Sequence, residues 1–205
     1  MASTLQIAAS DAVHRIRRVQ AITIAWMGVE AAVSLFSAWR ARSPALLAFG
    51  GDSAVELLSA VGVLWRFRTN AAHEHAERRA ARVAGLLLFA LAAYVALASS
   101  MSLLGYSEPK PSAMGIAVLV VAAAGMPWLA REKRKLSAAT GSAALRADAA
   151  ESALCAYLSV IALVGLGMNA IWRMRWADPV AALVILPLIL WEGREAIRGK
   201  PCGCC

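Results

Sequence analysis

Six apolar blocks divide the chain, and short polar stretches separate them. The blocks cover about residues 19–39, 44–66, 81–105, 112–130, 143–171 and 176–197. Each is close to the ~20 residues that an α-helix needs to cross the hydrocarbon core of a bilayer. The blocks lack the alternation of apolar and polar positions that is typical of barrel strands. Since only helices and closed barrels satisfy the backbone in lipid, the pattern predicts an all-α membrane protein with six transmembrane helices.

The blocks and their connections take up nearly the whole chain. We expect an N-terminal segment over residues 1–18, a six-helix transmembrane domain over 19–198 and a cysteine-rich tail over 199–205. A basic stretch, REKRKLSAATGS at 131–142, is predicted to be a loop between the fourth and fifth blocks. Asp178 and Pro179 are typical of a helix start, because Asp caps a helix and Pro fits its first turn.

The basic charge is distributed unevenly. The net charge is +8, and most Arg and Lys residues lie before the first block, between the second and third, after the fourth and after the sixth. By the positive-inside rule, both the N- and C-termini are then cytoplasmic. No recognised nucleic-acid-binding fold or stacking platform accompanies the charge, so we expect no nucleic-acid partner.

Acidic residues interrupt two of the apolar blocks in a similar way. The stretch GGDSAVELLS contains Asp52 and Glu56, and RADAAESALC contains Asp148, Glu151 and Cys155. Spacings of three, four and seven residues bring each set onto one helix face. A charged group at the bilayer centre costs about 2.5–3.5 kcal/mol even on the milder insertion scale. No Lys, Arg or His lies in the apolar part of a block to neutralise these acids. A bound cation or shared protons would then balance their charge.

The residue types indicate which cation such a site would bind. Asp, Glu and Cys together suit a borderline or soft divalent ion better than Mg²⁺ or Ca²⁺, which prefer oxygen alone. Asp52, Glu56, Glu151 and Cys155 supply four ligands, enough for tetrahedral Zn²⁺ or a similar ion. Two alternatives stay open: a single intramembrane acid can be an interfacial cap or a helix–helix hydrogen bond, and Cys155 can be a small packing residue.

Two further groups of metal-ligating residue types lie outside the blocks. His73 and His75 belong to the stretch HEHAE, and Cys202, Cys204 and Cys205 belong to the C-terminal CGCC. The two histidines suit one metal ion only in an extended loop, and a solvated loop is the alternative. Cytoplasmic thiols are mostly reduced, which favours metal binding over a disulfide. An incidental tail or an acylation site is the alternative for CGCC.

These motifs resemble the cation diffusion facilitator family. RADAAESALC, followed by WADP, is similar to its fifth and sixth spans, which typically read Ala-Asp-x-x-His-x-x-x-Asp and then Asp-Pro. FGGDSAVELLS is similar to its second span, where two ligands lie four residues apart. The resemblance implies a six-helix bundle in which helices two and five hold one metal ion that is exchanged for protons.

The resemblance also implies roles for individual residues. Asp52 and Glu56 match the second-span ligands, while Glu151 and Cys155 fall where the family usually has His and Asp. Asp148 falls beside the site, where it would support a ligand or relay protons. The sequence stops at GKPCGCC, so we expect no cytoplasmic C-terminal domain of the kind that usually provides dimerisation and metal sensing in this family.

We therefore expect a multi-pass protein of the bacterial inner (cytoplasmic) membrane that exports a divalent transition-metal or heavy-metal cation in exchange for protons. The cation would be Zn²⁺ or a softer ion such as Cd²⁺ or Pb²⁺, with no prosthetic group. The expected partners are the metal ion, the lipid bilayer and, as a candidate, a second copy of the chain in a homodimer. No nucleophile–base pair or phosphate-cradling loop indicates an enzyme. The alternative is a non-transporting membrane metal sensor or chaperone that works through the Cys tail.

Overall fold

The described secondary structure is entirely helical. The computed structural model describes residues 2–69, 74–140 and 143–198, with side chains for 18–58, 82–139, 146 and 148–198. Its helices are α1 (Ala2–Ala41), α2 (Pro44–Thr69), α3 (Glu74–Leu103), α4 (Ala113–Thr140), α5 (Ala143–Trp172) and α6 (Ala177–Arg198). They coincide with the six apolar blocks, which confirms the predicted all-α fold. The expected N-terminal segment continues α1 without a break.

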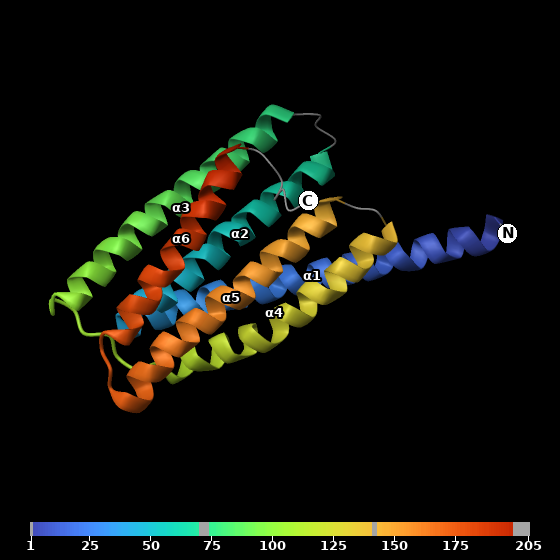
Figure 1. Ribbon diagram of the computed structural model, residues 1–205. Helices are drawn as coiled ribbons and strands as arrows, with labels where there is room; N and C mark the ends of the chain where they lie inside the picture. Colours follow the sequence, from blue (N-terminus) through green and yellow to red (C-terminus); the bar gives the residue numbers. More distant parts are fainter. Residues whose placement is uncertain (1, 70–73, 141–142, 199–205) are drawn as a thin grey trace.

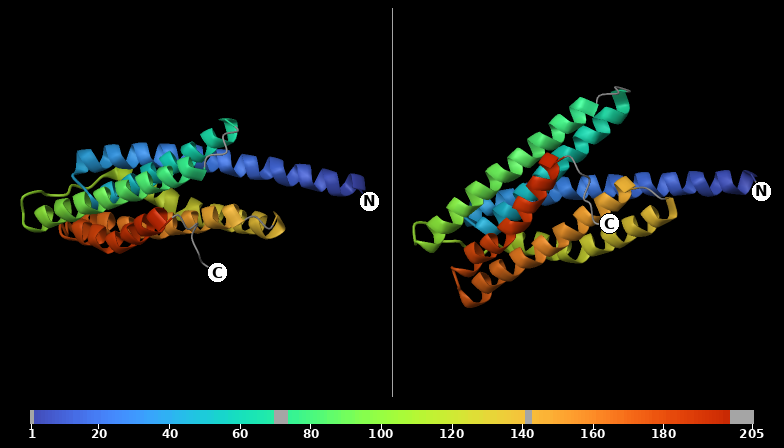
Figure 2. Two further views of the ribbon diagram at one scale, coloured as in Figure 1. Left: turned by 90° about the horizontal axis from the view of Figure 1, so that it is seen from above. Right: turned by 45° about the horizontal axis from the view of Figure 1, so that its top comes forward.

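The six helices run up and down through one bundle (Figure 1). The starts of α1, α3 and α5 and the ends of α2, α4 and α6 lie at one end, and the opposite helix ends lie at the other. The α2 helix is central, since it packs against α1, α3, α5 and α6. The other contacts between helices join α4 to α5, α3 to α6, α5 to α6 and α1 to α4. The first turns of α1 project beyond the other helices (Figure 2).

Four helices are long and apolar enough to cross a membrane by length and composition alone. Within the described part of the chain these are Arg18–Ala41, Arg82–Leu103, Ala113–Ala139 and Asp148–Trp172. The other two helices are α2, which contains Asp52 and Glu56, and α6, which contains Glu192. Large side chains such as Tyr94 and Tyr157 are exposed on the bundle exterior, as expected of a surface that faces lipid.

The predicted loop over 131–142 is wrong for residues 131–140, which continue α4 as far as Thr140. Residues 131–140 contain no Gly or Pro, and their Lys, Arg, Glu, Leu and Ala residues are strong helix formers. This extension places Lys133 inside the helix packing, where its side chain is fully buried.

Small residues let neighbouring helices approach closely. A Cβ on Gly50 of α2 would lie 2.7 Å from the Cβ of Ser34 on α1. A Cβ on Gly165 of α5 would lie 2.4 Å from the Cβ of Ala181 on α6. Because larger side chains do not fit at these positions, glycine fixes where α1 meets α2 and where α5 meets α6.

The start of α2 is tied to the start of α6. Ser43 is the N-cap of α2, where its Oγ accepts a hydrogen bond of 3.1 Å from the Leu46 amide. The same hydroxyl donates to Asp178 Oδ2 at 2.5 Å, and Asp178 Oδ1 accepts from the Ala45 amide at 3.2 Å. Asp178 therefore lies in the first turn of α6, as the Asp-Pro motif predicts, and also caps α2.

Candidate metal site

Three carboxylates from α2 and α6 meet inside the bundle. Carboxylate oxygens of Asp52, Glu56 and Glu192 all lie within 4.8 Å of one another. Asp52 and Glu56 are four residues apart on α2, so they face the same way, and Glu192 approaches from α6. Two oxygens bound to one Zn²⁺ lie at most about 4.4 Å apart, so small side-chain shifts would bring all three onto one ion. We call these residues the carboxylate triad.

The triad leaves hydrogen-bonding capacity unused. Among the described residues, both Asp52 oxygens, Glu56 Oε1 and Glu192 Oε2 are buried without a hydrogen-bond partner. A buried polar group left unpaired costs about 1–3 kcal/mol, and more when it is charged. Acids of like charge cannot satisfy one another unless they share protons or bind a cation. The donor set therefore fits a cation held by oxygen ligands.

Two of the predicted ligands on α5 lie near the triad but not within it. Cys155 is buried, and its Sγ donates a hydrogen bond of 3.1 Å to Glu30 Oε1 on α1. Glu151 has an exposed side chain that lies within electrostatic range of Glu192 and Asp148. The structure thus brings Asp52 and Glu56 together, as the spacing predicts, and places Glu192 of α6 beside them.

The sequence motifs do not indicate Glu192, which follows Trp191 in the polar stretch WEGREAIR and resembles an interfacial residue. The spacing of Glu192 from apolar residues on α6 nevertheless indicates that it faces the bundle interior. Glu192 lies seven and three residues after Ile185 and Ile189, which are both fully buried. Those spacings place it on the inward face of α6.

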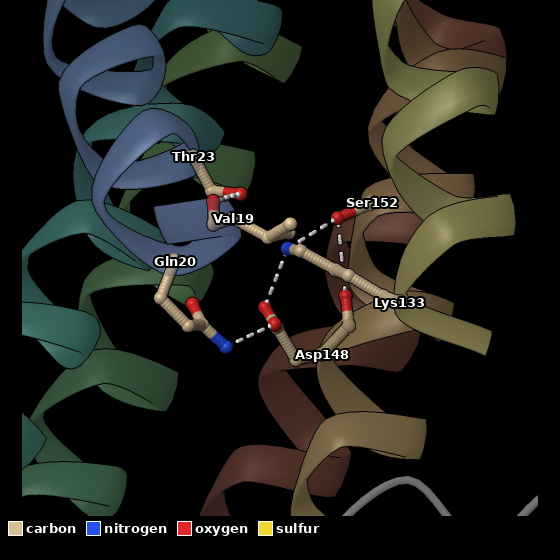
Figure 3. Close-up of polar contacts among 6 residues, drawn as sticks. All are labelled: Val19, Gln20, Thr23, Lys133, Asp148 and Ser152. Atoms are coloured by element: carbon tan, nitrogen blue, oxygen red, sulfur yellow. Dashed lines mark hydrogen bonds and ion pairs between the residues drawn. The ribbon is translucent and has the colours of Figure 1, made fainter. Parts of the chain in front are cut away.

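Asp148 belongs to a separate polar network that joins three helices (Figure 3). Lys133 Nζ on α4 donates hydrogen bonds of 2.8 Å to Asp148 Oδ1 and to Ser152 Oγ on α5. Gln20 Nε2 on α1 donates to Asp148 Oδ2 at 2.6 Å. Lys133 therefore balances the charge of Asp148, although no basic residue lies in the apolar part of a block. It can do so because α4 continues beyond its apolar part and places Lys133 beside α5.

The peripheral metal candidates are not tested by the structure. His73, Cys202, Cys204 and Cys205 lie outside the described residues. His75 lies in the first turn of α3, and its side chain is also outside the described set. Metal binding by these residues stays a prediction.

Comparison with known proteins agrees with this architecture. Residues 21–199 match the family model of the cation efflux transmembrane domain. The chain is also 27% identical over 169 residues to an uncharacterized transporter of Synechocystis sp., in an alignment that covers 76% of this chain and 53% of the relative. The chain thus spans about half the length of the curated relative it matches. Since the family match takes in nearly the whole helical bundle, the chain belongs to the cation efflux family of multi-pass membrane transporters.

Proposed function

We propose that this transporter moves a divalent transition-metal or heavy-metal cation, and that the carboxylate triad binds the cation on its path. The observation that carries the proposal is the convergence of Asp52, Glu56 and Glu192 with unpaired, buried oxygens. The ion is Zn²⁺ or a softer relative, since carboxylate oxygens and a nearby thiol are within the range of ligands that such ions accept.

Proton exchange follows from the chemistry of the ligands. Carboxylates bind metal only when they are deprotonated, so metal and protons compete for the same oxygens. We propose that the cation displaces protons on the cytoplasmic side and that protons from the other side displace the cation. Net export from the cytoplasm results when the proton gradient is directed inward. Rocking of α2 and α6 against their neighbours would expose the triad to each side in turn.

The sidedness rests on the distribution of basic residues. Of the 21 Lys and Arg residues, five lie at the bundle end where α1, α3 and α5 finish: Arg40, Arg42, Lys110, Arg173 and Arg175. The others that belong to the described helices lie toward the opposite end, where α1 begins. By the positive-inside rule, that opposite end is cytoplasmic. Glu151 is exposed and lies five residues C-terminal to Arg146 near that end, which makes it a candidate first contact for an entering cation.

Flux through proteoliposomes tests the proposal. Purified protein is reconstituted with an internal metal indicator and a pH dye, and Zn²⁺, Cd²⁺, Pb²⁺, Co²⁺ and Fe²⁺ are supplied one at a time. We expect metal entry with proton movement in the opposite direction for at least one of these ions. Asp52→Asn, Glu56→Gln and Glu192→Gln should each abolish it.

Glu195→Gln is the matched control. Glu195 lies one turn beyond Glu192 on α6, and its carboxylate is 3.7 Å from the Arg198 guanidinium rather than in the triad. This variant should transport at the wild-type rate. Wild-type protein that binds metal but moves none would instead favour the metal sensor, and full flux in Glu192→Gln would remove α6 from the site.

A further inference from the structure

A second group of ligand atoms lies beside the triad, at the point where α1, α2 and α5 meet. Glu30 Oε1 on α1 accepts hydrogen bonds from Cys155 Sγ at 3.1 Å and from Ser53 Oγ at 2.8 Å. A carboxylate, a thiol and a hydroxyl thus come together from three helices. Glu30 and Ser53 do not belong to the ligand set that the sequence motifs predict.

The environment of Glu30 is unusual for a residue that only packs. Its side chain is 0% exposed, and its second oxygen, Oε2, has no hydrogen-bond partner among the described residues. A buried carboxylate normally pairs with a cation or accepts hydrogen bonds at both oxygens. Within the described residues, no Lys, Arg or His forms an ion pair with Glu30, whereas Asp148 pairs with the buried Lys133. One oxygen therefore remains available to a ligand.

This group is continuous with the triad. Asp52 and Ser53 are consecutive on α2, about 100° apart around the helix, so α2 presents Asp52 toward α6 and Ser53 toward α1. Asp52 and Glu56 both lie within electrostatic range of the Cys155 sulfur, and Glu30 lies within range of Asp52. A cation would therefore move between the two groups without leaving a negatively charged environment.

Resting on the proposed transport function, we propose that Glu30, Cys155 and Ser53 form a second binding station for soft divalent cations, next to the carboxylate triad. Cys155 supplies the thiolate that selects Cd²⁺, Pb²⁺ or Hg²⁺ over harder ions, and Glu30 supplies an oxygen ligand. Binding replaces the thiol proton with the metal ion, and the released proton leaves to water. The triad binds oxygen-preferring and soft ions alike, whereas the station favours the soft ones.

Cadmium titration of a single-cysteine protein tests the station directly. The chain has four cysteines, so replacing Cys202, Cys204 and Cys205 with Ser leaves Cys155 as the single thiol. Cd²⁺ alone is added to this full-length protein in detergent, and the ultraviolet charge-transfer band of a Cd–thiolate bond is recorded. We expect a saturable band that disappears in Cys155→Ser.

Glu30→Gln in the same background isolates the carboxylate, because Gln keeps the shape of Glu and still accepts the Ser53 hydrogen bond. We expect its Cd²⁺ affinity to fall at least about 10-fold, the smallest loss that removing even a supporting residue normally causes. Glu192→Gln should keep the band, since Glu192 belongs to the triad. Helical content and thermal unfolding of each variant, measured alongside, confirm that the proteins compared are folded.

The outcomes separate the station from the transport function. An absent band, or an affinity unchanged by Glu30→Gln, overturns the station even if the protein transports Zn²⁺. A band with the expected dependence on Glu30, in a protein that moves no metal in proteoliposomes, overturns the transport function and leaves the station in place.

Discussion

Lys133 Nζ on α4 lies 2.8 Å from Asp148 Oδ1 on α5, with the lysine side chain completely buried and the aspartate one quarter exposed. Ser152 and Gln20 complete the hydrogen bonding of this pair, so α1, α4 and α5 are joined at one point (Figure 3). Asp148 lies one turn before Glu151 on the same helix. The charge of Asp148 is therefore balanced by a lysine, whereas the acids of the carboxylate triad have no such partner among the described residues.

Lys133→Met is expected to destabilise the bundle by about 3 kcal/mol, because it leaves the largely buried Asp148 carboxylate without its cationic partner. The double variant Lys133→Met with Asp148→Asn should recover part of this loss, since no unpaired charge remains. Denaturant unfolding in detergent, followed by circular dichroism, measures both free energies of unfolding.

Lys135→Met is the control for that prediction. Lys135 is on the same helix but is mostly exposed, and it pairs with Glu132 at 2.9 Å within one turn. Exposed pairs of this kind contribute about 0–1 kcal/mol, so little change is expected. Equal losses from Lys133→Met and Lys135→Met would show that the buried pair has no special role.

Gly165→Ala is expected to destabilise the protein by about 1–3 kcal/mol, because the added methyl group overpacks the contact between α5 and α6. Its Cβ would lie 2.4 Å from the Ala181 Cβ and 3.0 Å from the Ala177 carbonyl oxygen. Gly167, two residues along the same helix, has nothing within 4 Å of an added Cβ. Gly167→Ala should be neutral or stabilising by up to about 1 kcal/mol, since Ala favours helix more than Gly. Thermal unfolding of the two variants makes the comparison.

Cys155→Asp is expected to retain Zn²⁺ transport and to lose the preference for softer ions, because a carboxylate is a harder ligand than a thiolate. The measurement is the ratio of initial Cd²⁺ and Zn²⁺ uptake rates into inverted membrane vesicles, normalised to folded protein. An unchanged ratio in an active variant would remove Cys155 from the transport path and leave a site made of carboxylates.

The topology makes a prediction about labelling. In intact cells, a membrane-impermeant maleimide should react with an introduced Ser107→Cys in a background that lacks the tail thiols. It should not react with Cys202, Cys204 and Cys205 of the wild-type chain until the cells are opened. Ser107 lies between α3 and α4, at the end of the bundle that has few basic residues. Reaction of both sites from the same side would refute the assignment of the basic end to the cytoplasm.

The six helices and part of the candidate site can be predicted from the sequence alone. Six apolar blocks of membrane-spanning length predict six helices, because hydrophobicity and backbone hydrogen bonding in lipid are properties of each segment alone. The pairing of Asp52 with Glu56 is equally local, since residues four apart on a helix share a face. The apolar block is shorter than α4, because charged residues end the block whereas residues of high helix propensity continue to Thr140.

Which helix faces meet depends on how the six helices pack against one another. The contact of Cys155 with Glu30 spans 125 residues, and the hydrogen bond that joins Gln20 to Asp148 spans 128. Glu192 reaches Asp52 because α6 packs against α2. No periodicity within one helix contains that information. It depends on how closely the helices approach at residues such as Gly50 and Gly165, where side-chain volume sets which faces can touch.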